Sequence, residues 1–171
     1  LCVTTGVYPT DDKSKSLVST ICESPNKRGC EKNWVYLSHN NKLKVIYQWY
    51  PLDICHMDGN QLVSEKTTID VPAFFKHLRG SSHGCNFNKE IWFITHLVEP
   101  SSPRVYYHCV VVLDEATLNY KRHSILFKFE DIPIEYCVGF IVEPTRIIFG
   151  YSKMDRETII AVFDKPSIDN L

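Results

Sequence analysis

Polar side chains that could hold a ligand occur at three points in the sequence, each just before an apolar run. The three groups are Glu31-Lys32-Asn33-Trp34, Arg79-Gly80-Ser81-Ser82 and Glu135-Tyr136-Cys137-Val138-Gly139. Charges placed at the start of a buried strand are costly to desolvate unless they meet one another or a ligand. Carboxylate, amide and guanidinium groups beside aromatic rings suit a polyhydroxylated molecule. We expect the groups to converge on one pocket; a satisfied surface ion pair is the alternative for each group alone.

The elements that must position these groups are short β-strands. Helical spacing is almost absent from the chain, and only residues 69–78 could make a short turn, which Pro72 weakens. Val, Ile, Tyr, Phe and Trp gather in short runs, and turn residues separate the runs. The pattern therefore predicts an all-β chain.

The predicted strands recur in three units with a period of about 50 residues. In each unit a short first strand precedes a strand that ends in an aromatic residue or His, and a third strand closes on an Asp. The first strands are residues 33–38, 80–87 and 136–142; the second are 45–49, 92–96 and 147–151; the third are 51–58, 104–114 and 158–164. Residues 61–71 and 124–129 would supply fourth strands.

This period, with about four strands in each unit, is typical of β-propeller blades, whose first strands line a central channel. The expected blades are residues 31–78, 79–130 and 131–171, and residues 1–30 would be a remnant of a preceding blade and a linker. Three blades are fewer than the roughly four to eight that close a propeller. We therefore expect part of a five-bladed type of propeller, with unpaired strand edges unless another segment or subunit covers them. The alternative is a meandering sandwich.

Composition narrows the class of protein. The 171 residues are 44% hydrophobic and 23% charged, which fits a globular domain and excludes a collagen, a coiled coil or a disordered tail. The formal charge is −1 and like charges never form long blocks, so we expect no nucleic-acid partner. No apolar run approaches the roughly 20 residues of a membrane span, so no membrane partner is expected either. The chain starts with Leu rather than Met and shows no leader, which suggests that it begins partway through a longer one.

The seven cysteines, an odd number without paired or zinc-finger spacing, predict reduced thiols in a cytoplasmic protein with no metal and no cofactor. Cys109 could pair with His96 or His108 as a nucleophile, but its apolar run favours a buried, inert thiol. Gly-rich phosphate loops and serine-hydrolase motifs are absent from the sequence. Glu135 and Asp155 are the best carboxylates for glycoside chemistry, as hydroxyl ligands more than as an acid/base pair.

Five motifs in order resemble a propeller domain of large DNA viruses and bacteria that often accompanies glycosyltransferases. They are Glu31-Lys32-Asn33-Trp34, Arg79-Gly80-Ser81-Ser82, residues 92–96, Arg104-Val105-Tyr106-Tyr107-His108 and Ile134-Glu135-Tyr136-Cys137-x-Gly139. The resemblance covers about residues 30 to 165. More distantly, the chain is similar to glycoside hydrolase family 130, the five-bladed mannoside phosphorylases and hydrolases.

The resemblance implies roles for individual residues in binding a sugar. Lys32 and Asn33 stand where the family keeps a basic residue and an Asn near its phosphate or leaving-group side. The remaining matches are Arg79, Gly80 and Ser81 in the glycine-rich channel strand, His96 and Tyr106 on the next two strands, Glu135 and Gly139 in a Glu-x-x-x-Gly pattern, and Asp155 after Tyr151 as the sugar-binding Asp of the closing blade.

Two departures bear on activity. Trp49-Tyr50-Pro51 falls where a phosphate-binding arginine is expected, which argues against phosphorolysis. The family's catalytic Asp lies in an earlier blade, and Asp11-Asp12 stands in a loop-like stretch that does not match its motif, so no catalytic residue is assigned.

Three hypotheses for function follow. The first is a carbohydrate-active propeller acting on mannose-like sugars, with Glu135, Asp155, His96 and Arg79 in its pocket. The second is a non-catalytic glycan-binding module that positions a fused or neighbouring glycosyltransferase. The third is a structural protein–protein propeller, whose channel Trp34 and Trp92 would fill.

Overall fold

The computed structural model describes residues 1–7, 18–26 and 29–169. Almost every regular element in this part of the chain is an antiparallel β-strand, which confirms the predicted all-β class. Asp11 and Asp12 fall outside the described residues. In the described ranges, no helix is long and apolar enough to cross a membrane.

The strands form one hairpin and three larger sheets that follow one another along the chain. The hairpin pairs β1 (Thr4–Val7) with β2 (Val18–Ile21). The first sheet has the order β3 (Val35–His39), β4 (Lys42–Trp49), β5 (Leu52–Asp58) and β6 (Gln61–Thr68). The second has the order β11 (Tyr120–His123), β10 (Val105–Asp114), β9 (Glu90–Glu99) and β7 (Arg79–Gly80), and β8 (Cys85–Phe87) also pairs with β9. The third has the order β12 (Glu135–Val142), β13 (Arg146–Lys153) and β14 (Glu157–Asp164).

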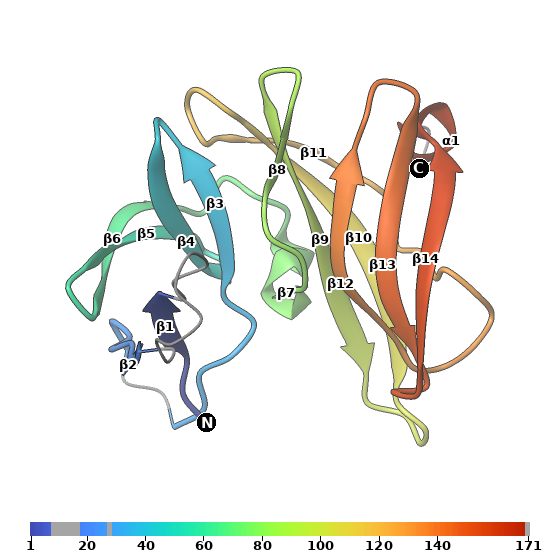
Figure 1. Cartoon of the computed structure of the whole chain (residues 1–171), viewed down its shortest axis with the longest axis horizontal. Helices are drawn as coiled ribbons and strands as arrows, with labels where there is room; N and C mark the ends of the chain where they lie inside the picture. The colour runs from blue at the N-terminus through green and yellow to red at the C-terminus, as the bar shows by residue number, and fades with distance from the viewer. Residues whose placement is uncertain (8–17, 27–28, 170–171) are drawn as a thin grey trace.

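The sheets lie side by side in chain order (Figure 1). Three clusters of buried apolar side chains pack between the layers. The hairpin side of the first sheet is packed around Trp34, Val45 and Tyr47. The opposite face of that sheet shares a larger core with the second sheet, in which Phe93 is fully buried. The other face of the second sheet, with Trp92, packs on the third sheet. Burying each such side chain contributes about 1.5–3 kcal/mol, so the middle sheet is held from both sides.

Tight turns set the register of two hairpins. Asn40 and Asn41 both have positive φ angles, 52° and 58°, between β3 and β4. Met154 and Asp155 have φ angles of 53° and 54° between β13 and β14. Paired left-handed residues make the type I′ geometry that matches the twist of adjoining strands. Asn and Asp adopt this conformation at low cost, which is why these sequences turn here.

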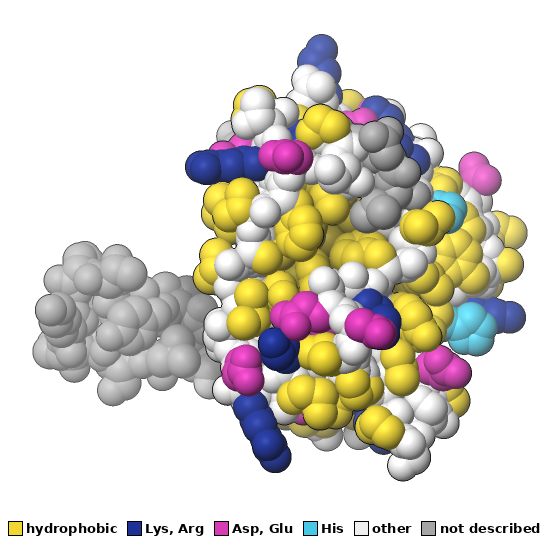
Figure 2. All heavy atoms as spheres, turned by 90° about the vertical axis from the view of Figure 1, so that its right-hand side faces the viewer, with side chains coloured by type: hydrophobic (Ala, Val, Ile, Leu, Met, Phe, Trp, Pro, Cys, Tyr) yellow, Lys and Arg dark blue, Asp and Glu magenta, His cyan; other side chains and the backbone are white. Residues whose placement is uncertain are grey.

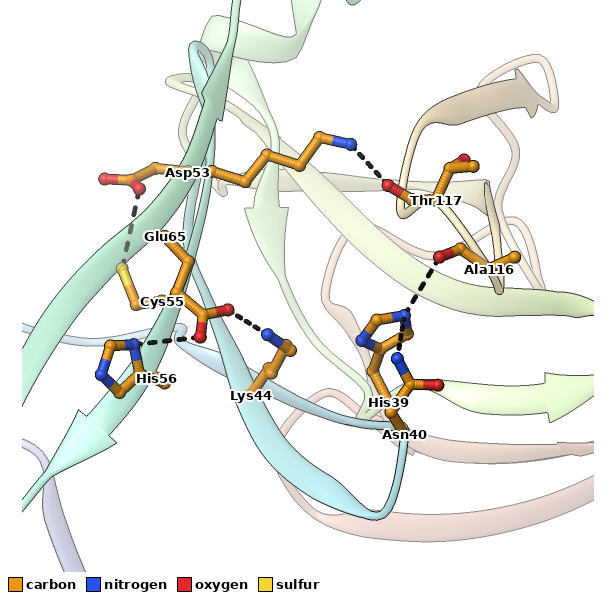
Figure 3. A network of polar contacts seen from close by, with 10 residues as sticks. His39, Asn40, Lys44, Asp53, Cys55, His56, Glu65, Ala116 and Thr117 are labelled. Atoms are coloured by element: carbon orange, nitrogen blue, oxygen red, sulfur yellow. Dashed lines mark hydrogen bonds and ion pairs between the residues drawn. The ribbon is translucent and has the colours of Figure 1, made fainter.

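Polar contacts join the first sheet to the β10–β11 turn of the second (Figure 3). The Lys66 ammonium donates to the Thr117 carbonyl oxygen at 2.5 Å, and a His39 ring nitrogen lies 3.3 Å from the Ala116 carbonyl oxygen. The same view shows Lys44 and His56 bridged by the Glu65 carboxylate on the exposed side of the first sheet. These contacts fix the outer ends of the two sheets relative to each other.

Two predicted first- and fourth-strand boundaries in the second unit are wrong. Residues 80–87 do not form one strand but divide into β7 and β8, because the N–H groups of Ser81 and Ser82 both bond to the Ile94 carbonyl oxygen. The outer strand is β11 rather than residues 124–129, which make an isolated bridge between Phe127 and His108.

Two further elements differ from the expectation, and a third lies within it. The predicted strand at residues 61–71 ends at Thr68, whose hydroxyl oxygen accepts a hydrogen bond from the Asp70 N–H at 3.1 Å and starts a turn. A 3₁₀ helix, η1 (Ala73–His77), occupies part of the expected short turn at residues 69–78. A short helix, α1 (Lys165–Asp169), follows β14 and has no signal in the apolar pattern.

Candidate functional site

A polar cleft of about 470 Å³ opens where the three sheets meet. One side of its wall is the segment that precedes β3. The rest comes from β7, β9, the turn between β9 and β10, β10 itself, and β12. The residues that line it are Lys32, Asn33, Arg79, His96, Val98, Pro100, Arg104, Tyr106 and Tyr136. Five of the sequence-predicted site residues therefore come together here, and Ser81 contacts the same His96 from behind.

His96 is the fixed centre of the cleft, with only 2% of its surface exposed. The Ser81 hydroxyl lies 2.7 Å from His96 Nδ1, and the Asn33 amide nitrogen lies 3.3 Å from Nε2. The ring of Tyr106 stacks on the imidazole at 5.8 Å between centroids, and Tyr136 meets it edge-on at 5.2 Å. Held on four sides, the imidazole has a single orientation toward a ligand.

The electrostatic setting keeps His96 neutral. Burial, with the nearby charges of Arg79 and Lys32, lowers its pKa from 6.5 to about 4. At neutral pH the ring therefore offers one N–H donor and one nitrogen acceptor rather than a positive charge. Its two nitrogens already face the Ser81 hydroxyl and the Asn33 amide, and its low pKa makes the ring a poor general acid near pH 7.

The charge of the cleft comes from Lys32, Arg79 and Arg104. Within the described ranges, none of the three forms an ion pair or a side-chain hydrogen bond, and no carboxylate lines this cleft. Three uncompensated cations around one opening create a positive potential that attracts an anion. Guanidinium groups in particular match the geometry of phosphate and carboxylate oxygens.

A second compartment of about 500 Å³ adjoins the first and shares Lys32, Asn33 and Arg79 with it. Its other walls include the aromatic residues Trp49 and Tyr50. The two compartments together offer a longer groove, with cations at their junction and aromatic surface at both ends. This groove has room for more than one sugar-sized group.

The backbone explains why the segment before β3 reaches β7 so closely. Asn33 has a φ angle of 64°, a left-handed conformation that Asn tolerates better than most residues. Opposite it, Gly80 leaves no room for a side chain, because a Cβ atom there would clash with Val35 and lie 2.5 Å from the Asn33 carbonyl oxygen. The glycine thus permits the contact that places Asn33 over His96.

The structure does not bring Glu135, Tyr151 and Asp155 into the cleft. Asp155 is exposed in the β13–β14 turn, which lies beside the first residues of β12 because Lys153 pairs with Glu135, but it does not line the cleft. The Tyr151 hydroxyl donates to Glu130 at 2.9 Å, and its ring stacks on Phe129. All three polar groups therefore reach the cleft, but the third group contributes Tyr136 instead of Glu135.

Glu135 is fully buried and has a structural set of partners. Its carboxylate accepts the N–H groups of Phe129 and Glu130, each at 2.7 Å, and lies 4.0 Å from His108 Nδ1. Burial raises the pKa of this carboxyl group, while burial and the neighbouring His96 lower the pKa of His108 to about 3. Glu135 consequently holds the loop before β12 against β10, behind the cleft wall.

Two polar side chains of the cleft, Arg104 and Tyr136, were not assigned from the sequence. Each belongs to a motif described above, but the sequence assigned a ligand-binding role to Tyr106 in the first motif and to Glu135 in the second. Strand alternation offers the missing signal for Tyr136, because neighbouring residues of a strand point to opposite sides and Glu135 is the one turned inward.

Cysteine and metal chemistry find no support in the described residues. Cys109 is fully buried, and burial raises its pKa to about 11, so it is not an activated nucleophile. In the same part of the chain, no group of three or more His, Cys, Asp or Glu side chains could hold a metal ion.

Comparisons with known proteins add no assignment. No protein-family model matches the chain, and no curated protein or solved structure is significantly similar to it. The resemblance to glycosyltransferase-associated propellers therefore stays a prediction.

Proposed function

We infer that the chain is a non-catalytic glycan-binding module, and that its cleft takes a sugar bearing an anionic group such as a phosphate. The observation that carries this proposal is the presence of three cations, unpaired among the described residues, around a neutral, rigidly held His96. In the same proposal, the three sheets are blades of an open propeller that faces the ligand with its first strands.

The two kinds of cleft wall support a ligand with two kinds of surface. Lys32, Arg79 and Arg104 suit an anion through charge-assisted hydrogen bonds, each worth about 1.5–3 kcal/mol. Tyr106 and Tyr136 add aromatic surface against which the apolar face of a sugar ring can pack. Asn33 can both donate to and accept from hydroxyl groups.

The enzyme hypothesis has less support from this geometry. Glycoside hydrolysis uses a pair of carboxyl groups on either side of the scissile bond. No carboxylate lines the cleft among the described residues, and the two candidates, Glu135 and Asp155, lie elsewhere. The scaffold hypothesis is not favoured either, because Trp34 and Trp92 pack in the cores between layers and do not line the cleft.

The test begins with a glycan array that includes phosphorylated, uronic-acid and neutral mannose-like sugars, followed by calorimetry on the best ligand. We expect anionic sugars to bind and Arg79→Met or Arg104→Met to weaken binding at least tenfold, which corresponds to about 1.4 kcal/mol. Raising the salt concentration should also weaken the binding of anionic sugars to the wild type, because salt screens the attraction between the cations and the anion.

The matched control is Arg156→Met, which removes an equally exposed arginine from the β13–β14 turn and should leave affinity unchanged. The proposal fails if no sugar binds, or if neutral and anionic sugars bind alike and Arg79→Met has no effect. Turnover of sugar-phosphate or nucleotide-sugar donors that is lost in His96→Gln would instead favour the enzyme hypothesis.

A further inference from the structure

The positive charge of the groove continues beyond the cleft, onto the short helix η1. Lys76 lies in the last turn of η1 and lines the second compartment, which shares Lys32 and Arg79 with the cleft. Arg104 lines the cleft but not the second compartment. Among the described residues, no carboxylate lines either compartment. We call these four side chains the groove cations: Lys32, Lys76, Arg79 and Arg104.

Basic side chains elsewhere on the surface have acidic partners. The Arg122 guanidinium lies 2.6 Å from Glu90, and the Lys153 ammonium lies 3.0 Å from Glu130. Figure 2 shows the end of the molecule formed by the third sheet, where several basic side chains lie beside acidic ones. Within the described ranges, none of the groove cations forms an ion pair or a side-chain hydrogen bond. Like charges left side by side favour a ligand that carries several negative charges.

The backbone that carries Lys76 is fixed by its neighbours. Phe75 is only 1% exposed, and its ring meets Trp49 edge-on in the core between the first and second sheets. The Leu78 N–H donates to the Phe75 carbonyl oxygen at 3.0 Å, directly before β7 begins at Arg79. Lys76 and Arg79 therefore project from one anchored segment at the border of the second compartment.

The two compartments together are larger than one sugar needs. Their volumes, about 470 Å³ and 500 Å³, each reach the range of roughly 300–1,000 Å³ that is usual for a small-molecule site. A single sugar phosphate in the cleft would leave Lys76 without a partner, because Lys76 does not line the cleft. A ligand that meets all the groove cations must therefore span both compartments.

A third compartment shows which way such a ligand runs. It has a volume of about 430 Å³ and also meets Lys76 and Arg79, but its wall contains Glu99, whose carboxylate accepts a hydrogen bond from the Tyr107 hydroxyl at 3.4 Å. A carboxylate in the wall repels a second acid group of a ligand. The favourable path for a polyanion therefore leads from the cleft into the second compartment.

We propose that the groove binds an oligosaccharide with acid groups on at least two neighbouring sugars. One acid group lies among Lys32, Arg79 and Arg104 in the cleft, and the next lies beside Lys76 in the second compartment. The inference rests on the proposed function and extends it from one anionic sugar to an anionic chain. Charge-assisted hydrogen bonds at both positions give the chain its advantage over a single unit.

A nucleic acid is the other common polyanion, and the chain fits it less well. Nucleic-acid sites combine a strongly basic surface with aromatic rings exposed for stacking on bases. Here the formal charge is −1, and the largest ring of the groove, that of Trp49, is only 3% exposed. An anionic glycan needs neither feature.

The test compares galacturonic acid with α-1,4-linked oligogalacturonates of two and four units by calorimetry. Repetition of one unit could by itself raise the affinity of the tetramer up to about fourfold. We expect the tetramer to bind at least tenfold tighter than the monomer. Raising the salt concentration should weaken binding of the tetramer more than that of the monomer, because more ionic contacts are screened.

Protein variants show whether the second compartment is used. Lys76→Met keeps much of the aliphatic stem but removes the charge, and it should weaken the tetramer at least fivefold while leaving the monomer unchanged. The matched control is Lys42→Met, which removes an exposed lysine at the end of β4 away from Trp49 and should change neither affinity. Circular dichroism checks that both variants fold.

The possible failures are distinguishable. A tetramer that binds less than tenfold tighter than the monomer, or equal effects of Lys76→Met and Lys42→Met, overturns the inference. If a sugar phosphate binds and no oligogalacturonate does, the inference fails and the proposed function stands; if no anionic sugar binds, both fail. Tighter binding of an oligothymidylate, lost in the same way in Lys76→Met, overturns the assignment to a sugar in favour of a nucleic acid.

Discussion

At the scale of single residues, the molecule keeps two buried histidines neutral beside a cationic opening. His96 and His108 stand opposite each other on β9 and β10, and both have lowered pKa values. The cost of burying them is met while they are uncharged, and it would rise steeply on protonation. The positive charge of the cleft therefore comes from Lys32, Arg79 and Arg104, and the buried imidazoles add none to it near neutral pH.

We predict that stability falls as the pH drops from about 6.5 toward 4. In the unfolded chain a histidine takes up a proton near pH 6.5, whereas folded His96 and His108 resist protonation down to about 4 and 3, so acid favours unfolding. Each unit of pKa difference is worth about 1.4 kcal/mol. The raised pKa of Glu135 acts in the opposite sense, because it adds stability at low pH that is lost as the pH rises through that pKa.

Urea unfolding at pH 7, 6, 5 and 4.5 measures this dependence, with His108→Gln as the comparison. The variant should show a shallower decline than the wild type, since one of the two titrating groups is gone. Equal slopes in the two proteins would show that His108 does not carry the effect.

At the scale of elements, the close approach of β7 to the segment before β3 is what assembles the cleft. We predict that Gly80→Ala lowers the free energy of unfolding by about 1–3 kcal/mol, because the added methyl group clashes with Val35 and crowds the Asn33 carbonyl. It should also weaken ligand binding by moving Asn33 away from His96.

Gly29→Ala is the control, because a Cβ atom there meets nothing within 4 Å. Its stability should stay within about 0.5 kcal/mol of the wild type. Urea titration and calorimetry on both variants check the prediction; a Gly80→Ala protein as stable as Gly29→Ala would contradict it.

How far the sequence predicts these elements depends on the range of the interactions that form them. Alternating apolar residues and Asn-rich turns act locally, so the bounds of the second and third strands of each unit were predicted within three residues. The division of residues 80–87 arises from hydrogen bonds to Ile94, a contact between strands that no local pattern reveals. The same holds for the cleft: Asn33, Arg79 and His96 lie together as predicted, but the inward turn of Glu135 depends on the N–H groups of Phe129 and Glu130, which bond to its carboxylate.

At the scale of the whole molecule, stability is arranged as a series of layers. The middle sheet shares a core with the layer on each side, while the third sheet exposes Val138, Ile141, Ile160 and Val162 on its outer face. We predict that backbone amides of β9 and β10 exchange with solvent slowest and those of β14 and the β1–β2 hairpin fastest, because opening an outer layer disrupts one core only. Native-state hydrogen exchange with peptide-level resolution measures this order. Uniform exchange across all layers would show that the molecule opens as one unit.

The position of the cleft at the junction of the three sheets has a thermodynamic consequence. A ligand that contacts Lys32, Arg79 and Tyr136 together touches all three layers, so any one layer that swings away loses the ligand as well. Ligand binding and the stability of the layered fold are then linked. At a ligand concentration one hundred times the dissociation constant, binding raises the free energy of unfolding by about 2.7 kcal/mol. The occupied protein becomes a single cooperative body, although no disulfide bond and no closed ring of sheets among its described residues holds the layers together.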